Sequence, residues 1–147
     1  MNEHRPARMN LHRLSRVQAR YESGMEHVRR GRHGRAARSF NRAIRLDGDK
    51  AEYRYLRGLV YIHLERYDRA ISDFRAAVAR APAHAKAHAC LGSTYAMVAE
   101  YELAVECYEE AIRVDPGYEQ ARAGLEAIRA FLGSRGGEAR DLGPQTE

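Results

Sequence analysis

One spacing limits the possible folds of this chain more than any other feature: similar residues recur every 34 positions, three times over. The recurring types are a glycine, an alanine, an aromatic residue and a second alanine. In chain order they are Gly24, Gly58 and Gly92; Ala36, Ala70 and Ala104; Phe40, Phe74 and Tyr108; and Ala43, Ala77 and Ala111. A fixed period of this length is typical of an array of identical supersecondary units. The chain is therefore expected to be a short repeat array, and such an array is a surface suited to holding another polypeptide.

Aligned on these glycines, the chain divides into units at 17–50, 51–84 and 85–118, and each unit predicts two helices. In the middle unit they are AEYRYLRGLVYIHL and YDRAISDFRAAVARA, and the second shows an apolar stripe at helical spacing. Pro82 and Pro116 follow two of the predicted helix ends, where proline cannot continue a helix. Asp49 and Glu52 have the spacing of a capping box that would open the second unit.

The small residues have a packing reason, because two helices joined by a short turn approach closely only where side chains are small. These residues resemble the tetratricopeptide repeat family, whose pattern is Leu-Gly, Tyr, Ala, an aromatic residue, Ala and Pro. The third unit matches best, through Leu91, Gly92, Tyr95, Ala104, Tyr108, Ala111 and Pro116. The second unit departs at Arg57, where Leu is usual. The first unit is degenerate at Ser23, His27, His33 and Gly48.

The resemblance covers residues 17–118 and implies an all-α fold. The expected architecture is a right-handed helical-hairpin solenoid of three tetratricopeptide units. Residues 119–132 supply a C-terminal capping helix, because a solenoid end otherwise leaves an apolar face uncovered. Residues 1–16 are a basic N-terminal segment, partly helical, with the first helix starting between Asn10 and Ser15. The glycine-rich tail 133–147 is expected to be disordered.

The inner surface of such an array is lined by the first helix of each unit. The resemblance predicts a peptide-binding groove here, and it is largely apolar. Its predicted residues are Tyr21, Met25, Tyr55, Leu56, Leu59, Ile62, His63, Lys86, Ala89, Cys90 and Met97. An apolar groove without other cover favours binding of an extended or helical segment with spaced apolar anchors. The alternative is that neighbouring helices or the N-terminal segment cover these residues.

Some relatives clamp a peptide C-terminal carboxylate with Lys and Asn at fixed groove places. In this sequence those places carry Tyr21, Met25, Leu56 and Cys90, and only Lys86 fits. The resemblance therefore implies no clamp of that kind. Three repeats with an apolar groove also resemble the secretion chaperones that hold translocator proteins.

Charge is unevenly distributed along the chain. Residues 1–50 carry 13 basic and 5 acidic groups, 51–84 carry 6 and 4, and 85–147 carry 6 and 11. The balance therefore runs from +8 through +2 to −5. Arg35, Arg38, Arg42 and Arg45 fall on one helix face and predict a basic outer face. A solvated surface, an acidic partner, nucleic acid and self-association all stay open, although few aromatic residues interleave with these arginines, which disfavours nucleic acid.

No catalytic constellation is evident, and the chain lacks phosphate-cradling glycine loops and the CxxC and HExxH motifs. We therefore expect no enzyme activity, no cofactor and no metal, even though His84, His88 and Cys90 lie close in sequence. The two cysteines predict free thiols rather than a disulfide framework. No stretch could cross a membrane and the basic N-terminus has no apolar signal region, so a cytoplasmic location is expected.

The sequence thus predicts a protein-protein interaction module, an adaptor, scaffold or small chaperone that holds a peptide segment in an apolar concave groove. The alternative is a basic-surface binder of nucleic acid or another anionic partner.

Overall fold

The computed structural model describes the backbone of residues 5–141 and the side chains of residues 11–136. Within the described backbone the chain forms seven α-helices and no strand. They are α1 (Arg5–Arg29), α2 (His33–Leu46), α3 (Ala51–His63), α4 (Tyr67–Arg80), α5 (Ala85–Met97), α6 (Tyr101–Val114) and α7 (Glu119–Asp141). The fold is an all-α helical repeat solenoid, as the 34-residue period predicts.

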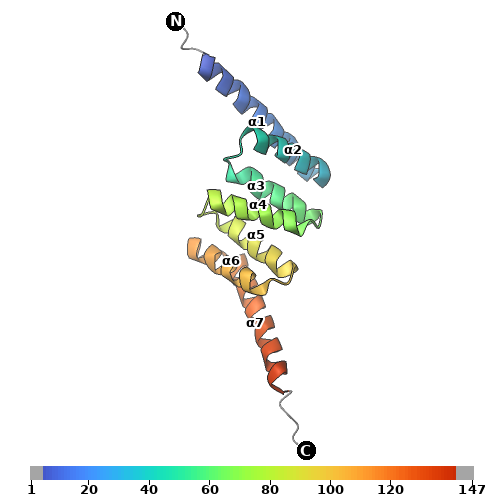
Figure 1. Ribbon diagram of the computed structural model, residues 1–147, viewed down its shortest axis with the longest axis vertical. Helices are drawn as coiled ribbons and strands as arrows, with labels where there is room; N and C mark the ends of the chain where they lie inside the picture. The colour runs from blue at the N-terminus through green and yellow to red at the C-terminus, as the bar shows by residue number, and fades with distance from the viewer. Residues whose placement is uncertain (1–4, 142–147) are drawn as a thin grey trace, which may run out of the picture. The chain divides into compact units, whose positions relative to one another are not determined.

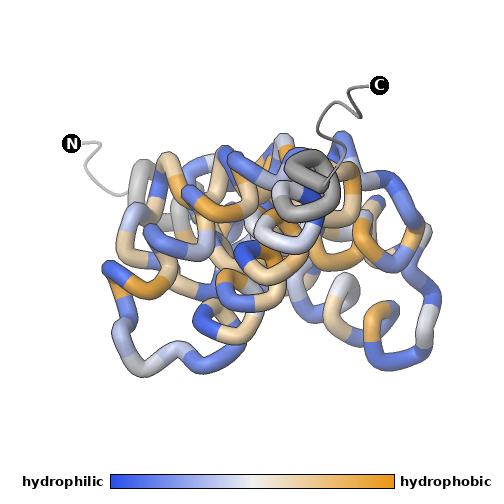
Figure 2. The backbone as a smooth tube through the Cα atoms, turned by 90° about the horizontal axis from the view of Figure 1, so that it is seen from below, coloured by the Kyte–Doolittle hydropathy of each residue, from blue (hydrophilic) through white to orange (hydrophobic). Residues whose placement is uncertain are grey.

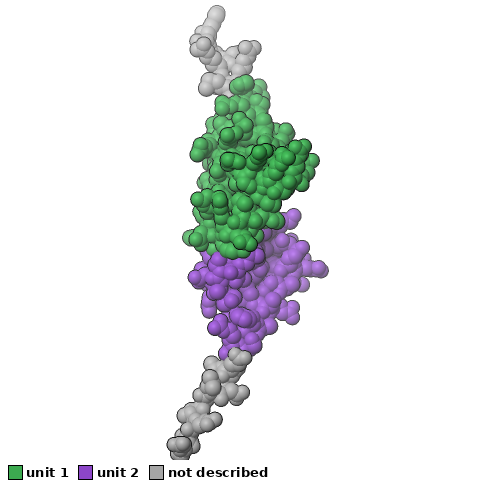
Figure 3. All heavy atoms as spheres, turned by 90° about the vertical axis from the view of Figure 1, so that its right-hand side faces the viewer, with its two compact units in different colours: residues 1–83 green, residues 84–147 purple. Residues whose placement is uncertain are grey.

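The helices belong to two compact units, residues 1–83 and 84–147 (Figure 3). In the first unit α1 packs on α2 and α3 packs on α4, while α2 also packs on α3 (Figure 1). In the second unit α5 packs on α6, and both contact α7. Apolar and hydrophilic residues are interspersed along the helices instead of forming long apolar runs (Figure 2). Among residues 5–141, no helix is both long enough and apolar enough to span a bilayer.

The recurring glycines lie where each helix pair makes its closest contact. A Cβ atom placed on Gly24 would lie 2.6 Å from Cε1 of Phe40, and one on Gly58 would lie 2.7 Å from Cε1 of Phe74. On Gly92 it would lie 3.2 Å from the Tyr108 ring. The predicted packing role of the glycine and the aromatic residue is thereby confirmed in all three pairs.

Replacing Gly58 with Ala tests this contact. Phe74 is fully buried, so its ring has little room to move away from the added methyl group. We expect overpacking of about 1–3 kcal/mol, reduced by about 1 kcal/mol because alanine favours the helix more than glycine does. Chemical denaturation of the Gly58→Ala variant measures the difference. Gly34→Ala is the matched control, since a Cβ atom there would have nothing within 4 Å; equal effects in the two variants would contradict the explanation.

The two helices of each pair are joined by the same kind of turn. The residue types at the turn do not predict it. Gly31, Glu65 and Ala99 are 34 residues apart and all adopt positive φ, at 66°, 55° and 63°. In each turn the next residue donates its backbone N–H to a carbonyl five positions earlier, as in Arg66 to Tyr61 at 2.9 Å. This bond satisfies a carbonyl at the helix end. Of the three, only Gly31 is a residue type that favours this backbone conformation.

The predicted helix ends are partly confirmed. α4 ends at Arg80 and α6 ends at Val114, so Pro82 and Pro116 each lie two residues beyond a helix.

The predicted capping box is wrong. α3 begins at Ala51, its N-cap residue is Lys50 and no side chain caps it, so Asp49 lies one position too early to be the cap.

Both terminal helices are longer than predicted. α1 begins at Arg5, before the predicted window of Asn10 to Ser15. The capping helix α7 begins at Glu119 as predicted but continues to Asp141, so the predicted disorder is wrong for residues 133–141. Packing on α6 fixes the first turns of α7, and each further residue then adds a hydrogen bond with no new nucleation cost, even at glycine. Residues 142–147 lie outside the described part of the chain.

Candidate functional site

The first unit brings six of the predicted groove residues onto α1 and α3, and all six are half-buried. They are Tyr21, Met25, Tyr55, Leu56, Leu59 and Ile62. Two of the rings are anchored from behind: Tyr21 lies 5.7 Å from the Tyr53 ring, and Tyr55 lies 6.0 Å from the Phe74 ring, measured between centroids. The apolar side chains thus combine core contact with remaining solvent-accessible surface.

Two predicted groove residues have packing roles. His63 is exposed, but its ring stacks on His33 of α2, with centroids 4.4 Å apart and planes 5° apart, so one face of the ring is committed to the contact between α2 and α3. Ala89 of α5 is only 6% exposed and belongs to the core of the second unit. The placement of Ala89 in the groove is therefore wrong, because the packing of α5 against its neighbours buries that side chain.

The remaining predicted groove residues of the second unit lie on α5. Lys86 and Met97 are exposed, Met97 by 56%, and Cys90 is half-buried. The Cys90 carbonyl accepts hydrogen bonds from the hydroxyl groups of Ser93 and Thr94, at 3.0 and 2.6 Å. Both bonds lie within α5, so the two hydroxyl groups are satisfied inside the helix.

One member of the histidine and cysteine cluster near the start of α5 caps the helix. His84 is the N-cap residue of α5 and its Nδ1 accepts a hydrogen bond from the backbone N–H of Ala87 at 3.2 Å. Across the described residues no group of three or more His, Cys, Asp or Glu side chains is placed to hold a metal. Neither Cys90 nor Cys107, both within the described residues, forms a disulfide bond. Burial, with a smaller contribution from Glu106, raises the pKa of the Cys107 thiol to about 11, so it stays protonated at neutral pH.

The predicted basic outer face lies on α2. All four of its residues, Arg35, Arg38, Arg42 and Arg45, are exposed, whereas Phe40 of the same helix is fully buried. Two pockets open beside it, one lined in part by Arg35 and Arg38 and the other in part by Arg45. The face is therefore available to an anionic partner.

A buried ion pair lies beside this face. Its arginine, Arg57, stands in the sequence where the repeat pattern usually has Leu. The Arg57 guanidinium donates to both carboxylate oxygens of Asp73, Nε at 2.7 Å and Nη2 at 2.5 Å, and Nη1 donates to Oδ1 of Asn41 at 2.5 Å. The side chains are 17% and 4% exposed for Arg57 and Asp73. Burial opposes the charge on Arg57, but the hydrogen bonds and negative charge of Asp73 raise its pKa above the ordinary value.

A comparison between units could have found this pair. The residues 34 positions before Arg57 and Asp73 are Ser23 and Ser39, whose hydroxyl groups lie 3.2 Å apart. The residues 34 positions after them are Leu91 and Cys107. The two places are thus both polar in the first repeat, both charged in the second, and apolar or weakly polar in the third. Such matched changes are expected where two side chains face each other.

The fold and these surfaces define a helical repeat protein without an evident catalytic centre in its described residues. The tetratricopeptide repeat model matches residues 21–85, and a second model of the same repeat matches residues 85–118. Together the matches cover more than half of the chain, which therefore belongs to the tetratricopeptide repeat family. No curated protein matches the chain by sequence.

Solved structures share the fold. The crystal structure of MamA is 26% identical with a TM-score of 0.77, and the match covers 80% of this chain and 68% of MamA. The first repeat domain of Spaghetti (RPAP3), bound to the HSP90 peptide SRMEEVD, is 22% identical with a TM-score of 0.78. The match covers 81% of this chain and 94% of that domain. The second repeat domain of human RPAP3, in complex with the HSP70 peptide SGPTIEEVD, is 23% identical with a TM-score of 0.76, covering 80% and 98%. Because the two RPAP3 domains are only 22% and 23% identical to this chain, the comparison with them shows a shared fold alone.

Proposed function

We propose that this protein is a non-catalytic interaction module that holds a segment of a partner protein against the apolar faces of α1 and α3. Membership of the tetratricopeptide repeat family and the peptide complexes of two neighbours support an interaction role. The observation that carries the proposal is the set of half-buried apolar side chains on α1 and α3. Such surface gains free energy when a partner removes it from water.

The chemistry of these residues favours a partner with spaced apolar anchors. The neighbours bind peptides whose sequences end in EEVD. At the places where a carboxylate clamp would lie, this chain has Tyr21, Met25, Leu56 and Cys90, and of the clamp residues only Lys86 fits. Apolar side chains offer desolvation but few directional bonds, so a charged chain terminus would gain little from them.

A paired substitution on α1 and α3 tests the groove. Once affinity capture and mass spectrometry have identified a partner, we expect Met25→Gln with Leu59→Gln to weaken its binding by about 2 kcal/mol or more, about 30-fold in Kd. Isothermal titration calorimetry measures this change. Tyr55 is left intact because its ring contacts Phe74, and its loss would disturb the core.

The matched control is Leu14→Gln, which removes a leucine that is 54% exposed on α1. We expect the control to bind the partner as the unmodified chain does. A folded double variant that keeps full affinity would place the binding surface elsewhere, and an unfolded one would show that Met25 and Leu59 are core residues.

The exposed arginines of α2 support the alternative of a basic-surface binder. The apolar faces are the better supported site, because a solvated row of charges is common on helix surfaces, whereas several half-buried apolar side chains on two helices of one unit need a reason.

A further inference from the structure

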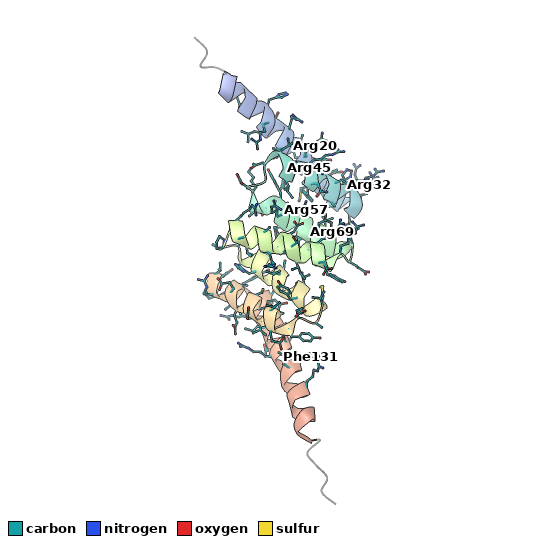
Figure 4. The ribbon with its side chains drawn as sticks, in the orientation of Figure 1. Arg20, Arg32, Arg45, Arg57, Arg69 and Phe131 are labelled. Carbon is teal, nitrogen blue, oxygen red and sulfur yellow. The ribbon has the colours of Figure 1, made fainter. Side chains whose placement is uncertain are left out.

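A second site lies in the first unit, between α2, α3 and α4. The three helices line an open pocket of about 340 Å³, at the lower end of the range for ligand pockets. Its lining residues are Asn41, Ile44, Arg45, Arg57, Tyr61, Arg69, Ser72 and Asp73. Figure 4 labels the three arginines, which come from three successive helices: Arg45 from α2, Arg57 from α3 and Arg69 from α4.

The buried ion pair fixes one of the donors in this pocket. Asp73 holds the Arg57 guanidinium in place, and Tyr61 lies against both Arg57 and Arg69, with its ring centroid 5.7 and 5.8 Å from the two guanidinium carbons. Asn41 accepts from Arg57 through Oδ1, so the free end of its amide is the NδH2 donor. The Ser72 hydroxyl is a further donor in the lining.

Positive charge exceeds negative charge in the lining. Asp73 balances Arg57, but Arg45 and Arg69 form no ion pair among the described side chains, which leaves a surplus of two positive charges. A surplus of two positive charges matches the charge of a small dianion.

We propose that this pocket binds a phosphomonoester or free phosphate dianion, with Arg45 and Arg69 as its charged ligands and Asn41 and Ser72 as neutral donors. Two guanidinium forks and two neutral donors match the several acceptor oxygens of a phosphate group. A carboxylate or a nucleic-acid phosphodiester carries a single charge and leaves one arginine unbalanced. The proposal goes beyond the groove and does not depend on it, because none of the apolar groove residues lines this pocket.

Nuclear magnetic resonance of the full chain tests the site at constant ionic strength. The probes are inorganic phosphate, a short peptide with one phosphoserine, the same peptide with glutamate in its place, and a short single-stranded DNA. We expect both phosphate probes to shift the side-chain amide signals of Asn41 and the backbone signal of Ser72 in a saturable way. Tighter binding of the phosphopeptide than of phosphate would assign the group to a phosphorylated protein segment, and the reverse order would assign it to the free ion.

Matched variants distinguish a specific phosphate site from nonspecific attraction of anions to the positive charges of the first unit. Arg45→Gln and Arg69→Gln should each weaken phosphopeptide binding about tenfold or more, because each removes a charge-assisted hydrogen bond. Arg42→Gln is the control, since it removes an exposed charge from the same helix outside the pocket lining; it should change binding less than about twofold. Absence of saturable shifts, equal binding of the glutamate peptide, tighter binding of DNA, or an equal effect of Arg42→Gln would each overturn the proposal.

Discussion

A chain that ends at Gly117 is expected to lose most of the stability of its second unit and to aggregate. Such a chain lacks α7, whose residues Ala121, Leu125 and Ile128 are at most 8% exposed and pack in one core with Tyr108 and Ala111. Losing the burial of two or three aliphatic side chains costs about 4–6 kcal/mol. That cost is comparable with the whole stability of an ordinary domain, about 5–15 kcal/mol.

The close fit of α7 on α6 strengthens this expectation. A Cβ atom on Gly124 would lie 2.5 Å from Cζ of Tyr108, so the helix approaches the ring as closely as the helices within each pair approach theirs. Without α7 the Tyr108 ring and its neighbours would face water. The ion pair between Arg129 and Glu109 is exposed and adds little.

Thermal unfolding followed by circular dichroism, with size-exclusion chromatography, measures the effect of this truncation. A chain that ends at Leu132 is the matched control. It keeps Ala121, Leu125 and Ile128, and the first side chains it loses, 133–136, are exposed. We expect its melting temperature to stay close to that of the full chain. An unchanged melting temperature in the shorter truncation would show that α7 does not stabilise the second unit.

Asp73→Ala is expected to destabilise the first unit strongly. It removes the carboxylate that both Nε and Nη2 of Arg57 contact, while the guanidinium stays mostly buried. Breaking a buried ion pair from one side costs about 3–5 kcal/mol, because an uncompensated charge remains. Denaturant unfolding monitored by helicity measures this loss.

A compensating substitution makes the test specific. Combining Asp73→Ala with Arg57→Leu removes both charges and restores the leucine that is usual in the repeat pattern. We expect this double variant to be more stable than Asp73→Ala alone, since an apolar replacement of both partners can be close to neutral. Asp68→Ala, at an exposed aspartate in the first turn of α4, should cost about 0.5 kcal/mol. Equal losses for Asp73→Ala and Asp68→Ala would show that the buried pair contributes nothing beyond an ordinary surface charge.

Features that repeat in phase could be predicted from the amino-acid sequence. Gly58 and Phe74 meet in the structure as Gly24 and Phe40 do, because the same small and large residues return at the same two places of each helix pair. The start of α7 and the burial of Leu125 and Ile128 also follow from sequence, since their apolar spacing is helical and a solenoid end must be covered.

Features that break the repeat depend on contacts between helices and needed the folded structure. The contact of Arg57 with Asp73 and Asn41 depends on which faces of α2, α3 and α4 meet, and no local pattern contains that information. The same holds for Ala89, which looks like a groove residue by position but lies in the core of the second unit. Glu65 and Ala99 adopt positive φ because the packing of each helix pair imposes the turn on whatever residue stands there. Repetition in a sequence reveals what every unit shares, whereas the properties that distinguish one unit arise from contacts between helices.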